Sequence, residues 1–328
     1  MKVKVLSEQE IKKVLTYRET IEAVEKSFAE YSSGKAIVPS VINLDIDRFQ
    51  GEVHVKSAYI QGEKFYVIKI ASGFYLNPSF GLPVGNGMVL LFEAKTGLLH
   101  CLMFDNGYIT EMRTGAAGAI AAKYLANKNL RKVAMVGSGS QARFQLKALL
   151  EVRSPQEVWV WSRNEDHAHK YIQEMQSLFP LKFQVSKNLE EAVRESDLLV
   201  TCTPSRSPLI KAQWVTKGMH ITAVGSDGPE KQELEVEVLK KADRIFCDSI
   251  SQCVRLGEVH HALEKKAIEE TKISGELGEI ALGQKKGRES EEEITVADLT
   301  GIGAQDAASA SLVYEKALKE NMGYFLEI

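Results

Sequence analysis

Cysteine is scarce in this sequence, and the few cysteines are not arranged to bind a metal or to form a disulfide scaffold. The 328 residues include four, Cys101, Cys202, Cys247 and Cys253, with no CxxC pair among them. Long apolar runs are also missing, since no stretch of about 18 apolar residues occurs that could span a membrane. The first ten residues, MKVKVLSEQE, lack the apolar core of a signal peptide. We therefore expect a soluble cytoplasmic protein with no disulfide scaffold, no bound metal and no membrane partner.

The sequence also has no excess of charge of either sign. Its 41 Lys and Arg residues nearly balance 44 Asp and Glu residues, which gives a net charge of −3 at pH 7. A surface that binds nucleic acid needs a basic excess, so nucleic acid is not an expected partner. Hydrophobic residues at 44% and charged residues at 26% are typical of a globular protein. A chain of 328 residues is expected to form two domains.

The first third of the chain predicts an α+β domain at residues 1–126. Residues 1–40 predict helices, because Ser7 with Glu10 and Thr16 with Glu19 fit capping boxes. Short β-branched and aromatic runs then predict a mixed or antiparallel sheet, with a hairpin connection at 93–97. The predicted strands lie at 52–57, 65–71, 88–92 and 98–104. Thr110 is expected to cap an Ala-rich helix at 111–126.

From residue 127 onward, strand-like runs alternate with helical stretches. The predicted strands lie at 133–137, 157–161, 182–186, 198–202, 219–224, 243–247 and 294–299. This alternation is typical of an α/β fold with a Rossmann-type doubly wound parallel sheet. We therefore expect a dinucleotide-binding domain at 127–303. The C-terminal segment 304–328 is expected to form a helix, and the charged segment 285–293 a solvated loop.

A glycine-rich loop follows the first strand of this second domain. The segment Gly137-Ser-Gly139-Ser-Gln-Ala142 has the pattern G-x-G-x-x-A and opens a helix. Gly137 permits a tight turn, Gly139 lets the backbone approach a pyrophosphate, and Ala142 allows close packing of helix on strand. The N–H groups at the start of that helix are suited to bind phosphates. The pattern predicts a dinucleotide site, and the alternative is a tight turn that binds nothing.

The end of the second strand bears on the choice between NAD(H) and NADP(H). An acidic residue there favours NAD(H) by binding the ribose 2′-hydroxyl, but this chain has Ser162-Arg163-Asn164. Ser162 and Arg163 are suited to hold a 2′-phosphate, so we expect NADP(H). The alternatives are that Arg163 is solvated or stacks on the adenine of NAD. The further residues expected at the cofactor are Ser140, Gln141, Thr201, Thr203, Val224, Gly225 and Gly303.

Two cations occur where charge is costly. Lys69 lies in the run 65–71, of which both alternating faces are apolar, so its ammonium is expected to be at least partly buried. Burial lowers the pKa of a lysine and lets it act as an acid or base near neutral pH, unless it reaches the surface or forms a structural ion pair. Arg113 is expected in the first turn of its helix, where a cation opposes the helix dipole. Its expected partner is a substrate carboxylate or an acid such as Glu111.

Asp227 is a candidate acid or base. It follows the predicted strand 219–224, and ligands bind at the carboxyl ends of parallel strands. The alternative is an Asx-turn or a helix cap before Pro229. The adjacent His260 and His261 are expected to diverge on a helix and do not predict a metal site.

These segments resemble the ornithine cyclodeaminase/mu-crystallin family over nearly the whole chain. The resemblance is most specific in 67–70 (VIKI), 81–83 (GLP), 105–114 (DNGYITEMRT), 137–143 (GSGSQAR), 224–227 (VGSD) and 298–303 (DLTGIG). It implies a homodimer built through the first domain, which the C-terminal helix rejoins, and an active site in the cleft between the domains. It also implies that Arg113 binds the substrate α-carboxylate, that Lys69 binds it and assists proton transfer, and that Asp227 is the acid/base residue.

Two positions distinguish members of the family. Asp227 matches the cyclodeaminases and alanine-dehydrogenase-like members, whereas the mu-crystallin ketimine reductases depart from it. Lys56 stands where cyclodeaminases have a glutamate near the substrate amine, and a lysine there repels a diamine but attracts a second carboxylate. Arg48 is a further candidate for a distal anion contact, and both Arg48 and Lys56 have the alternative of being surface charges. The segments 54–58 and 105–113 look most like members tied to ectoine breakdown and to iminosuccinate or alanine-type reduction.

The residues and the resemblance together predict an NAD(P)H-dependent oxidoreductase of amino acid metabolism. It is expected to reduce a small α-imino acid or ketimine to an L-amino acid, or to run the reverse reaction. One alternative is an ornithine cyclodeaminase, which forms proline and ammonia from ornithine with bound NAD. The other is a non-catalytic protein that binds NADPH or another small ligand, against which the presence of Lys69, Arg113 and Asp227 argues.

Overall fold

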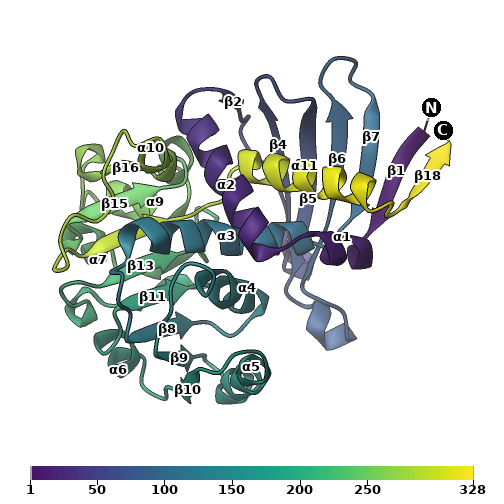
Figure 1. Ribbon diagram of the computed structural model, residues 1–328. Coiled ribbons are helices and arrows are strands. Elements are labelled where there is room, and N and C mark those ends of the chain that lie inside the picture. The colour runs from purple at the N-terminus through teal and green to yellow at the C-terminus, as the bar shows by residue number, and fades with distance from the viewer. Residues whose placement is uncertain (1, 328) are drawn as a thin grey trace. The chain divides into compact units, whose positions relative to one another are not determined.

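Two structural units meet in sequence within helix α3 (Tyr108–Leu125) of the computed structural model, which describes residues 2–327 (Figure 1). Unit 1 comprises the described residues up to Arg113 together with those from Ile302 onward, and unit 2 comprises Thr114–Gly301. The sequence placed the division at the end of this helix instead. The reason for the earlier division is that α3 carries Gly115, where a Cβ would lie 2.7 Å from the carbonyl oxygen of Phe144 in unit 2. This glycine lets most of α3 pack closely on helix α4 (Ser140–Leu149).

Unit 1 is a mixed sheet with helices. Its strands are β1 (Lys2–Ser7), β2 (Ala36–Ile37), β3 (Ile42–Ile46), β4 (Gly51–Ile60), β5 (Phe65–Phe74), β6 (Gly85–Glu93), β7 (Leu99–Phe104) and β18 (Tyr324–Glu327). Its helices besides α3 are α1 (Glu8–Val14), α2 (Tyr17–Ser32), the 3-10 turns η1 (Asp47–Phe49) and η2 (Asn77–Phe80), and α11 (Gly303–Lys319). The strand order is β18-β1-β7-β6-β5-β4-β2, and β3 also pairs with β4. Helix α11, in yellow in Figure 1, packs beside α2 and against β4 and β5.

Most of the predicted elements of unit 1 are confirmed, with three corrections. The C-terminal segment is helical only up to Lys319, and Tyr324–Glu327 form strand β18 because β1 offers an antiparallel partner. Residues 2–7 form strand β1 rather than part of a helix, because Val3 and Val5 are buried in a strand that pairs in parallel with β7. Helix α3 begins at Tyr108, before the cap predicted at Thr110. The carboxylate of Asp105 accepts a hydrogen bond from the Ile109 N–H at 2.9 Å and so stabilises the true helix start. The capping box at Ser7 is confirmed, whereas Thr16 caps its helix by accepting from the Glu19 N–H, and the Glu19 carboxylate accepts from the Thr16 hydroxyl rather than from its backbone.

Unit 2 has the predicted Rossmann-type doubly wound fold. Its strands are β8 (Lys132–Val136), β9 (Glu157–Trp161), β10 (Lys182–Val185), β11 (Leu198–Thr201), β12 (Arg206–Ile210), β13 (His220–Ala223), β14 (Gln232–Leu234), β15 (Arg244–Cys247), β16 (Gly275–Glu276) and β17 (Thr295–Asp298). Its helices besides α3 and α4 are α5 (Glu165–Leu178), α6 (Leu189–Arg194), η3 (Ala212–Trp214), α7 (Val236–Lys241), α8 (Ile250–Cys253), α9 (Gly257–Glu264), η4 (Glu270–Lys272) and α10 (Leu277–Ala281). The main sheet has eight parallel strands in the order β10-β9-β8-β11-β13-β17-β15-β16.

The apolar strands of unit 2 separate two hydrophobic cores. Along β8, Ala134 and Val136 belong to the core beneath α6, α7 and α9, whereas Val133 and Met135 belong to the core beneath α3, α4 and α5. Alternating side chains of one strand thus contact helices on both faces, as a parallel sheet requires. This arrangement brings the carboxyl ends of β8, β9, β11 and β13 to one edge, beside the glycine-rich loop.

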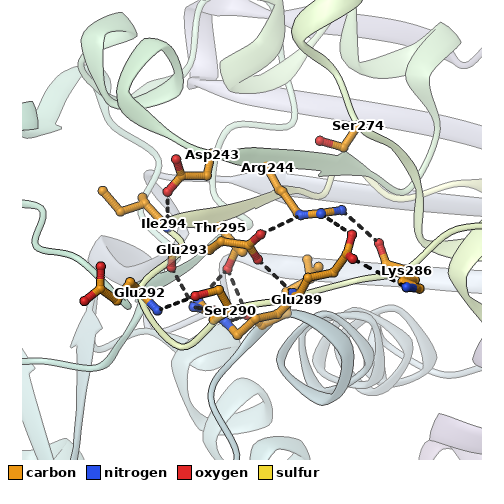
Figure 2. Close-up of polar contacts among 12 residues, drawn as sticks. Asp243, Arg244, Ser274, Lys286, Glu289, Ser290, Glu292, Glu293, Ile294 and Thr295 are labelled. Atoms are coloured by element: carbon orange, nitrogen blue, oxygen red, sulfur yellow. Dashed lines mark hydrogen bonds and ion pairs between the residues drawn. The ribbon is translucent and has the colours of Figure 1, made fainter.

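The charged segment 285–293 is a largely exposed loop, as expected, and it is also anchored by arginines. Figure 2 shows the guanidinium of Arg244 between the carboxylates of Glu289 and Glu293, with its Nε 3.1 Å from Glu293 Oε1. Arg288 donates hydrogen bonds to the carbonyl oxygens of Leu125 and Met219. The loop is anchored because these two arginines neutralise its acids and satisfy backbone carbonyls. Of the helices in residues 2–327, none is long and apolar enough to cross a bilayer.

Candidate active site

Three buried charged side chains of unit 1 meet at one point. Lys69 lies on β5, Arg113 on α3 and Asp306 in the first turn of α11, and each is at most 4% exposed. Lys69 Nζ lies 3.1 Å from Asp306 Oδ1 and 3.0 Å from Oδ2, while Arg113 Nε donates to Oδ1 at 2.9 Å. The predicted burial of Lys69 is confirmed. Two cations share one carboxylate, so the cluster carries a net positive charge when Lys69 is protonated.

This excess of positive charge, together with burial, changes the pKa of Lys69. Burial, followed by repulsion from Arg113, lowers the pKa of Lys69 from 10.5 to about 7, although Asp306 opposes the shift. Burial also disfavours the charged form of Asp306, but attraction to Arg113, Lys69 and Lys56 outweighs it and lowers the pKa of this carboxyl below 3.8. Asp306 therefore stays ionised near neutral pH, whereas Lys69 exchanges its proton there. Such a lysine is suited to acid or base chemistry.

Arg113 has donors left for a ligand. It lies in the second turn of α3, since this helix begins at Tyr108, and its partner is Asp306 rather than Glu111. Its Nη1 donates to Gln305 Oε1 at 2.8 Å, and within residues 2–327 its Nη2 donates no hydrogen bond. A guanidinium has five N–H donors, of which Nη2 carries two. In the same part of the chain Gln305 Nε2 is buried without a hydrogen-bond partner, as is Asp105 Oδ1. Buried polar atoms without a partner are typical of a site that receives a polar ligand.

The two candidate distal anion contacts differ in their surroundings. Lys56 lies on β4 directly opposite Lys69 of β5, and it is only 8% exposed. Its charge adds to the cationic character of the cluster, because it lowers the pKa of both Lys69 and Asp306. Arg48 lies in η1, is exposed, and has its guanidinium 5.4 Å from the centre of the Phe49 ring. Lys56 thus lies close to Lys69, whereas Arg48 contacts the ring of Phe49, its neighbour in the sequence.

The glycine-rich loop of unit 2 has the geometry predicted for a phosphate-binding turn. Gly137 has a φ of +116°, and a Cβ there would lie 2.9 Å from the carbonyl oxygen of Cys202. Gly139 is the N-cap of α4, and a Cβ there would contact nothing within 4 Å, so its backbone faces open space. Ala142 is fully buried against α5, where Tyr171 donates to its carbonyl oxygen. Arg143 supports the loop by donating to the carbonyl oxygens of Ser138 and Gly139.

A cavity of about 230 Å³ lies at this loop, within unit 2. It is lined by Gly137, Ser138, Gly139, Trp161, Ser162, Arg163, His167, Cys202, Thr203, Pro204, Ser205 and Leu209. The glycine-rich loop and the predicted specificity residues Ser162 and Arg163 therefore share one cavity. The open Gly139 backbone, the N-terminus of α4 and a cavity at the carboxyl ends of the strands fit a dinucleotide.

The remaining residues that were predicted to contact the cofactor lie in different parts of the fold. Ser140 and Gln141 form the first turn of α4, and Gln141 accepts a hydrogen bond from Gln145. The Asn164 side chain caps α5 by accepting from the Asp166 N–H, while Thr201 and Val224 are buried at the ends of β11 and β13. Gly303 belongs to unit 1, where it lets α11 approach β4, since a Cβ would lie 2.5 Å from the carbonyl oxygen of Ser57.

Asp227 forms an ion pair in the loop after β13. Lys231 Nζ lies 2.8 Å from Asp227 Oδ1, and the Lys231 side chain is 6% exposed against 39% for Asp227. The carbonyl oxygen of Lys231 contacts His261 Nε2 at 2.8 Å and accepts from Ser226 Oγ. A fixed ammonium therefore orients a half-exposed carboxylate.

One group of metal-ligating types occurs within residues 2–327. His260, His261 and Glu264 of α9 have ligand atoms within 4.8 Å of one another. The two imidazoles do not diverge as expected, because their ring centroids are 5.2 Å apart. His260 Nδ1 contacts the carbonyl oxygen of Val254, and His261 Nε2 contacts that of Lys231. These contacts give each ring a place in the fold without a metal.

Sequence reasoning missed the residues that organise the predicted ones. Asp306 joins Lys69 and Arg113, Lys231 pairs with Asp227, and Gln305 holds Arg113. The signal for Asp306 was weak, since an acid in the first turn of a helix is ordinarily explained by the helix dipole. Lys231 follows Asp227 at a spacing of four, but only the folded loop shows that the two side chains meet.

Comparison with known proteins shows the family to which this chain belongs. The ornithine cyclodeaminase/mu-crystallin family profile matches residues 1–321. An archaeal alanine dehydrogenase, solved as a dimer with bound NAD, is 39% identical, with a TM-score of 0.93 over 100% of both chains. Delta(1)-pyrroline-2-carboxylate reductase of Thermococcus litoralis, solved with NADH and L-proline, is 34% identical, with a TM-score of 0.94 over 98% of this chain and 99% of that one. Iminosuccinate reductase of Paracoccus denitrificans, solved with NAD+, is 30% identical, with a TM-score of 0.89 over 100% of both chains. The chain therefore belongs to the ornithine cyclodeaminase/mu-crystallin family.

Proposed function

We propose that this protein is a nicotinamide-dependent oxidoreductase that interconverts a small α-imino acid and the corresponding L-amino acid. The observation that carries the proposal is the buried cluster of Lys69, Arg113 and Asp306, which combines a carboxylate-binding guanidinium with a lysine that titrates near pH 7. The cavity at the glycine-rich loop of unit 2 supports the proposal of a nicotinamide cofactor. The relatives named as alanine dehydrogenase, pyrroline-2-carboxylate reductase and iminosuccinate reductase support the reaction class.

The residues divide the work as follows. Arg113 binds the substrate carboxylate through Nη2 while Asp306 and Gln305 keep its guanidinium in one orientation. Lys69 Nζ lies beside it, adds a second contact to the carboxylate, and exchanges a proton with the reacting group. The nicotinamide supplies or removes the hydride when it is bound. Positioning the substrate by its carboxylate is the main contribution of the protein.

Asp227 is proposed to exchange a proton with the substrate amine. Its ion pair with Lys231 favours the ionised carboxylate, which is the form that accepts a proton or holds an ammonium group. The presence of an aspartate at position 227 also favours an activity like that of the alanine-dehydrogenase-like members of the family over that of the ketimine reductases.

We propose NADP(H) as the preferred cofactor. Ser162, Arg163 and His167 lie along one cavity, and Arg163 is a suitable partner for a 2′-phosphate. The solved relatives named above hold NAD(H), so NAD(H) is the competing choice. Replacing Arg163 and comparing the KM for NADPH with the KM for NADH distinguishes between the two cofactors.

The side chain of the substrate is proposed to be small and neutral or acidic. Lys56 is buried opposite Lys69, and a second ammonium group on the substrate would be repelled there. This argues against ornithine and hence against cyclodeamination. Arg48 is a further proposed contact for a distal carboxylate.

We also propose a homodimer built through unit 1. Large apolar side chains are exposed at the end of the sheet where β3 pairs with β4, and in the segment around η2. They include Ile42 (65% exposed), Leu44 (57%), Phe49 (52%), Phe80 (72%) and Leu82 (56%). Such a patch is typical of an interaction surface. Light scattering after size exclusion is expected to give twice the chain mass, and a monomer would contradict the proposal.

The test of the activity is nicotinamide absorbance with purified protein and either NADPH or NADH. The substrates are pyruvate with ammonia, oxaloacetate with ammonia, pyruvate or glyoxylate with methylamine, and the cyclic imine of proline. Consumption of the reduced cofactor with one of them is expected. Ammonia release from ornithine with catalytic NAD+, and no consumption across the panel, would make the protein a cyclodeaminase. Cofactor binding without either reaction would make it a binding protein.

A further inference from the structure

Glu233 is a buried carboxylate that binds two loops at once. It lies on β14 and is fully buried. Its Oε1 accepts hydrogen bonds from the N–H of Thr203 at 2.6 Å and from the hydroxyl of Thr203 at 2.7 Å. Its Oε2 accepts from the N–H of Gly225 at 2.9 Å. Both carboxylate oxygens are therefore engaged by donors from outside its own strand.

The two loops are those expected to serve the cofactor and the acid/base residue. Thr203 follows β11 and Gly225 follows β13, and these strands are neighbours in the parallel sheet. Thr203 lines the cavity at the glycine-rich loop, together with Cys202 and Ser205. Gly225 lies two residues before Asp227. Glu233 thus connects the wall of the cofactor cavity to the loop that carries Asp227.

The loops after β11 and β13 lie so close together that position 225 has room only for a glycine. A Cβ at Gly225 would lie 2.2 Å from the carbonyl oxygen of Thr203 and 2.6 Å from Glu233 Oε2. A side chain at 225 would therefore push apart the two loops and the carboxylate. The donors at Thr203 and Gly225 need an acceptor here, because leaving a buried N–H without a partner is costly.

The strand that carries Glu233 is held separately. Glu258 Oε1 accepts from the Glu233 N–H at 2.7 Å, and Glu258 Oε2 accepts from the Leu234 N–H at 3.1 Å. Burial raises the pKa of Glu233 to about 7, although the donors from Thr203 and Gly225 favour its charged form. The backbone of β14 is thus anchored by one carboxylate, and the Glu233 side chain remains to bind the loops.

We propose that Glu233 is a positioning residue, which holds Thr203 and Gly225 in the conformation that binds the nicotinamide cofactor and presents Asp227. The proposal rests on the proposed function, in which the cavity of unit 2 is the cofactor site. Glu233 acts through the two loops and does not itself touch the cofactor.

The test compares Glu233→Gln with the control Asp197→Asn. Glu233→Gln keeps the size of the side chain but places an amide N–H₂ near N–H donors. Asp197 is a matched control because its carboxylate also accepts two backbone N–H groups, those of Arg131 and Lys132, but at the amino ends of β8 and β11. The measurements are the Kd for NADH and for NADPH by fluorescence, the kcat and KM with the substrate found active, and the thermal unfolding temperature.

Glu233→Gln is expected to weaken cofactor binding at least about tenfold and to lower kcat, with little change in the KM of the imino acid. Asp197→Asn is expected to lower only the unfolding temperature. Unchanged cofactor binding in Glu233→Gln, or equal weakening in both variants, would overturn the proposal. If Glu233→Gln does not fold, Glu233→Asp, which retracts the carboxylate by one methylene, takes its place, and wild-type affinity in it would overturn the proposal as well. A wild-type protein that binds neither cofactor would instead refute the proposed function, and the inference with it.

Discussion

Replacing Lys69 with methionine is expected to change how the stability of the protein depends on pH. Lys69 loses its proton near pH 7 in the folded protein but near 10.5 in an unfolded chain. Between these two values the unfolded chain binds more protons than the folded one, so stability rises with pH. The charged lysine is the costly form because it is buried beside Arg113. Methionine fills similar space and carries no proton, so this rise is absent from Lys69→Met.

The size of the effect follows from the two pKa values. Between about pH 6 and about pH 9, the folded protein loses close to one proton at Lys69 while the unfolded chain keeps it. The difference in bound protons, summed over this range, is about 2 pH units, and at about 1.4 kcal/mol per unit it amounts to about 3 kcal/mol. Asp306 adds nothing to it, because Arg113 Nε remains 2.9 Å from Asp306 Oδ1 and keeps it ionised in both proteins.

The assay is urea unfolding of wild type and Lys69→Met, followed by far-UV circular dichroism, which reports on both units, at several values between pH 6 and 9 and at one protein concentration. The difference in the free energy of unfolding removes the titrations that the two proteins share. It is expected to grow in favour of the wild type by about 3 kcal/mol as the pH rises. A difference that stays constant across this range would show that Lys69 does not titrate there, and the proposed proton transfer at Nζ would lose its basis.

Three further substitutions test the proposed roles. Arg113→Ala is expected to raise the KM of the imino acid more than about tenfold without changing the Kd of the cofactor, because a carboxylate contact is lost; an unchanged KM would refute that role. Lys231→Met is expected to lower kcat, because Asp227 loses the ammonium 2.8 Å away that orients it, whereas Lys231→Arg retains more activity; equal rates in both would contradict the ion-pair argument. Arg163→Ala is expected to raise the KM for NADPH more than for NADH, and parallel changes in the two KM values would remove the basis for an NADP(H) preference.

Local patterns were sufficient to predict most elements. Apolar runs located seven of the eight strands of the parallel sheet within about one residue at each end, because strands buried on both faces are continuously apolar, whereas the two-residue β16 was not predicted. The pattern around Gly137 predicted a tight turn, which the structure has, since only glycine tolerates a φ of +116° so close to Cys202. The burial of Lys69 also followed from local pattern, as both faces of its strand are apolar.

Other local signals misled because a longer-range contact outweighed them. Residues 2–7 form a strand because they pair in parallel with β7, and no pattern within these residues indicates that pairing. Helix α3 begins before Thr110 because Asp105 binds the Ile109 N–H. The segment 285–293 is the exposed loop that was predicted, but its anchoring was not predicted, because Arg244, which lies between two of its glutamates, is far from it along the chain. In each case the deciding partner is specified by the fold.

The sequence by itself determined the fold class, the dinucleotide motif and the types of side chain available for chemistry. Only the tertiary structure decided which of them meet. Lys69 and Arg113 are joined by Asp306, which is 237 and 193 residues away from them, and Glu233 joins loops that follow two different strands. Periodicity and motifs report interactions between residues a few positions apart, whereas the partner of a buried charge is chosen by packing across the whole unit. The pKa of Lys69 near 7 is a property of that packing.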